Sequence, residues 1–143
     1  MHKALNYMSL ARKAGRIELG EEPVGGAARA QKARLIVVAS DASDHTWRRA
    51  KSFAAGTSQQ CIRTDFTKDE LGQATGRSSL AIAAFTDPAM ALAFVKALND
   101  PGHDGVLNAL QDRTNRLRQR QAEEKAHQRN KRAGKPVKPA MKK

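Results

Sequence analysis

The sequence predicts an α/β fold, a three-layer α-β-α sandwich with a small mixed four-stranded sheet. Short apolar runs alternate with helix-length amphipathic segments over residues 1–99, a pattern typical of helices layered on a sheet. Two runs, Leu35–Ala39 and Leu80–Phe85, are apolar at every position, as expected of strands buried on both faces. From Asp100 the composition changes. We therefore predict a domain at 1–99 and a basic extension at 100–143, helical at first and then disordered.

The chain opens with a predicted helix and a short strand. Leu5, Met8 and Ala11 recur at a helical spacing. Gly15 stands where a glycine commonly ends a helix. Ile17–Leu19 follows as a short strand, which we expect to lie antiparallel at an edge of the sheet.

A sharp corner then leads from this strand into a second helix. A single glycine, Gly20, connects the two elements and lets the backbone turn. The helix is predicted over 21–32, with Glu21 and Glu22 in its first turn, where the helix dipole favours acidic side chains. Amide groups at the start of a helix lack intrahelical acceptors, so we predict that this corner is the functional surface. Gly25–Gly26 either permits close approach of another group or is a tolerated weakness of about 1 kcal/mol per glycine.

Further helices and one further strand complete the predicted domain. Each helix has a recognisable start: Ser43 or Asp44 as an N-cap, Thr67–Glu70 as a capping box, and Asp87–Pro88 as a cap followed by an N1 proline. The predicted elements are a helix at 45–55, a strand at 60–63, a helix ending at Thr75 and a helix ending at Leu98.

Charge indicates a polyanionic partner. The chain holds 26 Lys and Arg against 14 Asp and Glu, a formal net charge of +12, and such a balance favours nucleic acid. More than half of this excess lies after Asp100. There we expect one more helix, from Val106 to Leu117, that frays from Arg118 into disorder. A tail that serves solubility alone is the alternative.

Other classes of function find little support. The single cysteine, Cys61, rules out an intrachain disulfide framework and suits a reducing cytoplasm. We interpret it as a small core or strand residue rather than a nucleophile. His45 has no partner at metal-ligand spacing, and no catalytic or nucleotide-binding motif occurs. No apolar run reaches the ~20 residues of a membrane span, and no signal peptide is recognised. We therefore expect a cytoplasmic protein that is not an enzyme and uses no cofactor or metal.

Several stretches resemble the ribosomal protein L7Ae family, and most closely its bacterial YlxQ-type branch. These stretches are Leu10–Gly15, Gly20–Glu22, Lys32–Ser43 and Leu71–Gly76, in the family's order and spacing. The resemblance spans roughly Ala4 to Leu98 and leaves the tail outside. It implies an α-β-α sandwich that binds RNA, often at kink-turns or related bent internal loops, without catalysis.

The resemblance also implies where RNA is bound: at the strand-to-helix corner and at the loop before the last strand. By position, the corner residues are Gly20, Glu21 and Glu22, the loop residues are Gly76, Arg77, Ser78 and Ser79, and the basic residue before the buried strand is Arg34. Nearby cations are predicted to neutralise phosphates; they are Arg12, Lys13, Arg16 and Lys32. The first three also suit a helix C-terminus, which by itself would explain them.

The corner departs from the kink-turn pattern of the family. Kink-turn binders usually carry Asn-Glu after the corner glycine and a Lys one turn on, and these side chains read tandem G·A pairs. The aligned positions here are Glu22, Pro23 and Gly26, and an ionised Glu22 can only accept hydrogen bonds. Arg29, one turn further along, is a candidate substitute for the missing lysine.

The predicted function is therefore non-catalytic binding of structured RNA, kink-turn-like or another bent internal loop, ribosomal or ribosome-associated. The free protein is predicted to be a monomer. The alternative is a protein-interaction module of the ribosome or of the transcription or translation machinery, whose basic tail binds nucleic acid non-specifically.

Overall fold

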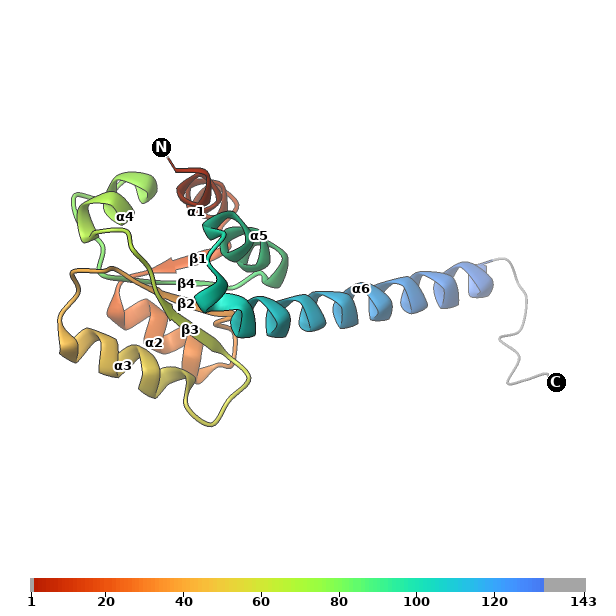
Figure 1. Cartoon of the computed structure of the whole chain (residues 1–143). Helices are drawn as coiled ribbons and strands as arrows, with labels where there is room; N and C mark the ends of the chain where they lie inside the picture. The colour runs from red at the N-terminus through yellow and green to blue at the C-terminus, as the bar shows by residue number, and fades with distance from the viewer. Residues whose placement is uncertain (1, 133–143) are drawn as a thin grey trace.

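The computed structural model of the chain describes residues 2–132. Its strands are β1 (Ile17–Leu19), β2 (Leu35–Val38), β3 (Gln60–Arg63) and β4 (Ile82–Phe85). They form one four-stranded sheet in the order β1-β4-β2-β3 (Figure 1). β1 and β2 run antiparallel to β4, whereas β2 and β3 run parallel. The predicted mixed sheet is confirmed, with β1 antiparallel at an edge.

Helices cover both faces of this sheet. They are α1 (Lys3–Lys13), α2 (Glu21–Arg29), α3 (Asp44–Ala54), α4 (Lys68–Thr75), α5 (Pro88–Leu98) and α6 (Asp104–Arg132), with a 3-10 turn at Pro101–His103 before the last. α1, α4 and α5 lie on one face of the sheet, and α2 and α3 lie on the other (Figure 1). This arrangement is the predicted three-layer sandwich. None of the described helices is long and apolar enough to cross a membrane.

The predicted helix starts are found with most of their hydrogen bonds. Ser43, rather than Asp44, caps α3, because its side chain accepts from the N–H of Thr46 at 3.1 Å. The Thr67–Glu70 capping box has both of its bonds, of 2.9 and 3.2 Å. Asp87 stands at the N-cap of α5 but makes no capping hydrogen bond there, so the N1 proline is the effective start signal.

α2 is shorter than the predicted helix over 21–32. It ends at Arg29 because Gln31 adopts a left-handed φ of 60°. The N–H of Gln31 then donates to Ala28 O, and the N–H of Lys32 donates to Ala27 O at 2.8 Å. This pair of bonds is a Schellman motif, which satisfies the last carbonyls of the helix. The chain is thereby turned back toward β2.

The core lies around the two central strands. Every residue of β2 and β4 is buried, as their continuous apolar runs predict. Phe94 of α5 packs on Phe85 of β4 with ring centroids 5.1 Å apart, which joins one helical layer to the sheet. Both ring systems are fully buried.

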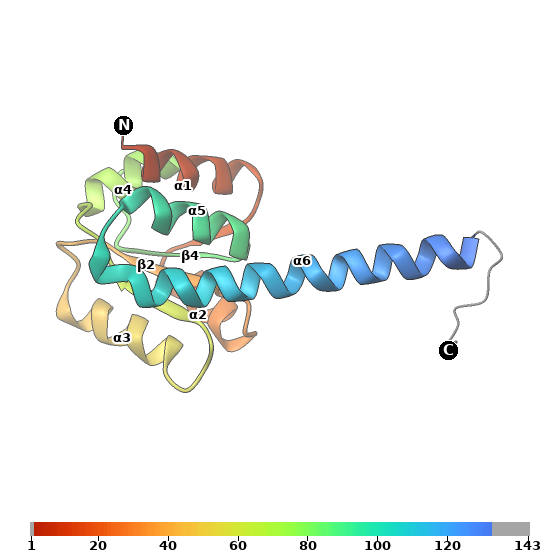
Figure 2. The ribbon, with the colours of Figure 1, turned by 45° about the vertical axis from the view of Figure 1, so that its right-hand side comes forward.

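α6 begins on the domain and then leaves it (Figure 2). Leu110 and Thr114 are only 1% and 3% exposed, and the helix contacts α5 and β3. The helix continues to Arg132, beyond Leu117, the predicted end of its regular part. From Arg118 to Arg132, most residues are the strong helix formers Gln, Arg, Glu, Lys and Ala, and this part of α6 contains no proline or glycine. The predicted disorder at 133–143 lies outside the described residues, and the division of the chain at residue 99 stays a prediction.

Candidate nucleic-acid interface

The corner at Gly20 presents an uncapped helix start. Gly20 has φ 98° and ψ 160°, a conformation that favours glycine. Its N–H donates to Ile82 O at 3.0 Å, and its C=O accepts from Val24 N at 3.0 Å, so the corner is anchored on β4. No side chain caps α2. The amides of Glu21 and Glu22 belong to the first turn and have no intrahelical acceptor, which leaves two donors for a ligand.

The loop from Gly76 to Ser79 folds back over α4. Gly76 ends the helix with a left-handed φ of 77°. The N–H of Arg77 donates to Gly72 O at 2.8 Å. A Cβ on Gly72 would lie 2.8 Å from both Arg77 O and Ser79 N, which is closer than real contacts allow. Gly72 therefore permits this loop conformation, although its only sequence signal is a glycine within a helix, where glycine is costly.

Three segments distant in sequence meet at this point. Nη1 of Arg77 lies 3.7 Å from where a Cβ on Gly20 would stand. Nη1 of Arg12, from the last turn of α1, lies 3.1 Å from the equivalent position on Gly76. Arg12 and the residues of the loop are exposed. We call this set the corner surface; it consists of Arg12, Gly20–Glu22 and Gly76–Ser79.

Beside the corner surface, α3 adds a cation for which the sequence carries no signal. Nε of Arg49 lies 3.5 Å from Oε2 of Glu21, and both side chains are nearly half exposed. A hollow of about 230 Å³ between α2 and α3 is lined by these two residues together with Glu22, Gly25 and Arg29. Arg29 thus lies beside the corner, as a substitute for the missing lysine would have to. Arg49 reaches it only because α2 packs on α3.

The two glycines of α2 differ in their surroundings. A Cβ on Gly25 would lie 3.1 Å from Cζ of Phe53 and 3.3 Å from Nη1 of Arg29. A Cβ on Gly26 would meet no atom within 4 Å among the described residues. Gly25 therefore permits close approach of α3, whereas no packing contact explains Gly26.

The structure does not bring all the predicted RNA-binding residues together. Arg16 O accepts from Thr86 N at 2.9 Å, and the N–H of Arg34 donates to Phe85 O at 2.8 Å. Both arginines thus lie where β4 ends, whereas Gly20 lies where β4 begins. At ~3.3 Å per residue, these two ends of β4 are about 10 Å apart. Of the remaining cations, Lys13 lies beside Arg12 at the exposed end of α1, and Lys32 is exposed ahead of Arg34.

The arrangement suits anion binding better than covalent chemistry. Backbone N–H donors and guanidinium groups together favour phosphate oxygens. Burial raises the pKa of the Cys61 thiol to about 12, which leaves it protonated and unreactive at neutral pH. Within residues 2–132, no three His, Cys, Asp or Glu side chains gather as metal ligands would.

Comparisons with known proteins identify the family. No family model matches the chain. RNA-binding protein YlxQ of Enterococcus faecium is 33% identical over 75 residues, which cover 52% of this chain and 72% of that protein. A Bacillus halodurans protein of unknown function shares the fold with a TM-score of 0.65 and 21% identity, over 70% of this chain and 100% of that one. The Giardia lamblia 15.5kD RNA binding protein shares it with a TM-score of 0.57 and 18% identity, over 74% and 85%. The E. faecium relative shows that this chain belongs to the YlxQ family, as the resemblance to the YlxQ-type branch of the L7Ae family predicts.

Proposed function

We propose that this chain is a non-catalytic protein that binds structured RNA through the corner surface. The position of Arg77 beside the uncapped start of α2, with Arg12 against the adjoining loop at Gly76, carries this proposal. The name of the E. faecium relative, RNA-binding protein YlxQ, supports it. In this model the first-turn amides bind phosphate oxygens, and the two guanidinium groups neutralise the strands that cross there.

The bound RNA is recognised by shape and backbone rather than by stacking on a sheet. Aromatic residues make up only 4% of the chain, and every Phe, Tyr and Trp side chain belongs to the core or packs against it. Open stacking platforms of the kind used by aromatic RNA-binding sheets are therefore lacking among these residues.

The proposed target is a bent internal loop, kink-turn-like in shape, in ribosomal or ribosome-associated RNA of the cytoplasm. Glu22 and Gly26 stand where kink-turn binders place a donor side chain and a lysine. Contacts to tandem G·A pairs are therefore fewer than in those binders, and backbone contacts carry a larger share of the affinity. Arg29 lies one turn from Gly26 and supplies the nearest cation on α2.

Crosslinking of the protein to RNA in its own cells, with sequencing of the bound sites, tests this function. We compare the wild type with Arg12→Gln/Arg77→Gln and with a control, Arg48→Gln/Lys96→Gln. The control removes the same charge from exposed positions on α3 and α5. We expect sharp sites at bent loops that vanish only in the first variant. Equal loss in both variants would refute the corner surface. A cellular complex that survives nuclease treatment would instead favour the protein-interaction alternative.

A further inference from the structure

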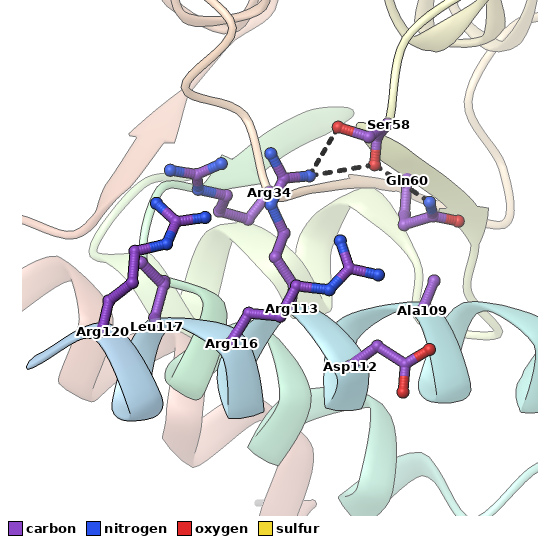
Figure 3. Close-up of a pocket in the computed structure, with 9 residues that line it drawn as sticks. All are labelled: Arg34, Ser58, Gln60, Ala109, Asp112, Arg113, Arg116, Leu117 and Arg120. Carbon is purple, nitrogen blue, oxygen red and sulfur yellow. Dashed lines mark hydrogen bonds between the residues drawn. The ribbon is translucent and has the colours of Figure 1, made fainter. Parts of the chain in front are cut away.

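A basic cleft (Figure 3) lies between α6 and the residues at the starts of β2 and β3. The corner surface lies at the opposite ends of the strands. Its volume is about 380 Å³, within the ~300–1,000 Å³ range of ligand sites. Arg113, Arg116 and Arg120 line one side, from α6, and Arg34 faces them from the start of β2. Asp112 is the single carboxylate among the described lining residues. We call this site the α6 cleft.

The fold holds the helical wall of the cleft in place. Leu110 and Thr114 are buried against the domain, which sets the rotation of α6 about its axis. Positions 113, 116 and 120 then fall along one adjacent face, because residues three, four and seven apart lie above one another on a helix. Nη1 of Arg113 also donates to Oγ of Ser58 at 2.7 Å and to its carbonyl oxygen at 3.3 Å.

The opposite wall is anchored by a buried side chain. Oε1 of Gln59 accepts from the N–H of Ala33 at 3.0 Å, and its Nε2 donates to Ala28 O at 3.2 Å. These bonds tie the segment before β3 to the segment before β2. The neighbours of Gln59 and Ala33, which are Ser58 and Arg34, are thereby held across from α6.

The charges of the cleft are not balanced. The pKa of Arg113 is lowered, first by burial and then by the like charges of Arg34 and Arg116. Nε of Arg34 is buried and has no hydrogen-bond partner within residues 2–132. The ion pairs found in that range lie elsewhere, at Glu21 and at Asp100. A partly desolvated cluster of guanidinium groups with a free donor is a site for an anion with several oxygens.

We propose that the α6 cleft is a second phosphate-binding site, which takes backbone phosphates of the RNA held at the corner surface. This inference rests on the proposed function. A guanidinium group binds phosphate oxygens through two parallel N–H donors. A cluster of arginines therefore suits a phosphate better than a single point charge does. The cleft and the corner surface lie at opposite ends of the strands. The RNA must therefore cross the domain to reach both.

A charge-matched pair of variants of the full chain tests the α6 cleft. Arg113→Gln/Arg116→Gln/Arg120→Gln removes three charges from the cleft. The control, with Arg118, Lys125 and Arg129 changed to Gln, removes three from the same helix. At ~100° per residue, the control positions point away from the cleft, and all three are exposed. Arg116→Gln/Arg120→Gln, which keeps the Arg113–Ser58 bonds, guards against a folding defect.

The probe is a fluorescein-labelled RNA hairpin with a kink-turn internal loop and a single-stranded flank. Its affinity is measured by anisotropy between about 50 and 200 mM salt. We expect the cleft variant to bind at least about tenfold more weakly than the control variant. We also expect its salt slope to fall by about 2, because each phosphate contact contributes ~0.7–0.9. Arg116→Gln/Arg120→Gln should show a smaller loss of affinity and a smaller fall in the salt slope.

The outcomes separate this inference from the proposed function. If the cleft and control variants bind alike while Arg12→Gln/Arg77→Gln loses binding, the cleft is refuted and the corner surface stands. If the wild type prefers the hairpin no more than duplex DNA of equal length, the proposed function fails and the cleft fails with it. If only the cleft variants weaken binding beyond their control, the second site is supported.

Discussion

Alanine at Gly72 is expected to destabilise the domain and weaken RNA binding together. A Cβ there would lie 2.8 Å from Arg77 O, 2.8 Å from Ser79 N and 2.9 Å from Ser79 Cα. These are backbone atoms, so the loop must move rather than a side-chain tip. The movement strains the bonds from Arg77 N to Gly72 O and from Leu80 N to Lys68 O. Overpacking of this kind costs about 1–3 kcal/mol and occasionally more, against the ~1 kcal/mol that alanine gains over glycine in a helix, so we expect a net loss of up to about 2 kcal/mol.

Gly26→Ala is the matched control, because it makes the same change in a helix with no described atom within 4 Å of the new Cβ. It should raise the free energy of unfolding by about 0.5–1 kcal/mol. Urea unfolding followed by circular dichroism measures both variants, and anisotropy with the hairpin RNA measures binding. We expect Gly72→Ala to lose about tenfold in affinity as Arg77 shifts. A Gly72→Ala protein as stable as the Gly26→Ala protein, with wild-type affinity, would refute the role of Gly72.

Three further predictions follow from single positions. Gly26→Lys should raise affinity for kink-turn RNA several-fold over Gly26→Gln in the anisotropy assay, because it restores the family's cation at a site with open space. Leu110→Ala should lower the free energy of unfolding by about 2–4 kcal/mol, whereas Leu10→Ala, at a side chain that is 51% exposed, should change it by under ~0.5 kcal/mol. Equal losses would contradict the packing of α6 on the core. Cys61, whose pKa is raised from 9.0 to about 12, should react with a thiol reagent at pH 8 about a thousandfold more slowly in the folded than in the unfolded chain. As pH rises, the thiol ionises in the unfolded chain before it ionises in the folded chain. The contribution of Cys61 to stability is therefore present below pH 9 and should be lost as pH rises toward 12. The difference in the free energy of unfolding between wild type and Cys61→Ala, followed with pH, measures this loss.

Signals confined to a few neighbouring residues determined most of the fold. The apolar runs of β2 and β4, the Thr67–Glu70 capping box and the turn at Gly20 each depend on local pattern, and each was predicted from it. Helix ends were predicted less well. The left-handed conformation of Gln31 ends α2 early, and no glycine marks that position.

Only the tertiary structure decided which distant side chains meet. The corner and the loop were both predicted to bind RNA from the family resemblance, and the position of Arg77 close to Gly20 depends on the pairing of β1 with β4. Arg34 precedes a buried strand as predicted. The register of that strand places Arg34 beside α6, at the end of the sheet away from Gly20. The rotation of α6, set by the buried Leu110, then decides which arginines face it. A sequence determines local backbone preferences within a turn or two, whereas contacts between helices and strands depend on packing that residues far apart in the chain set jointly.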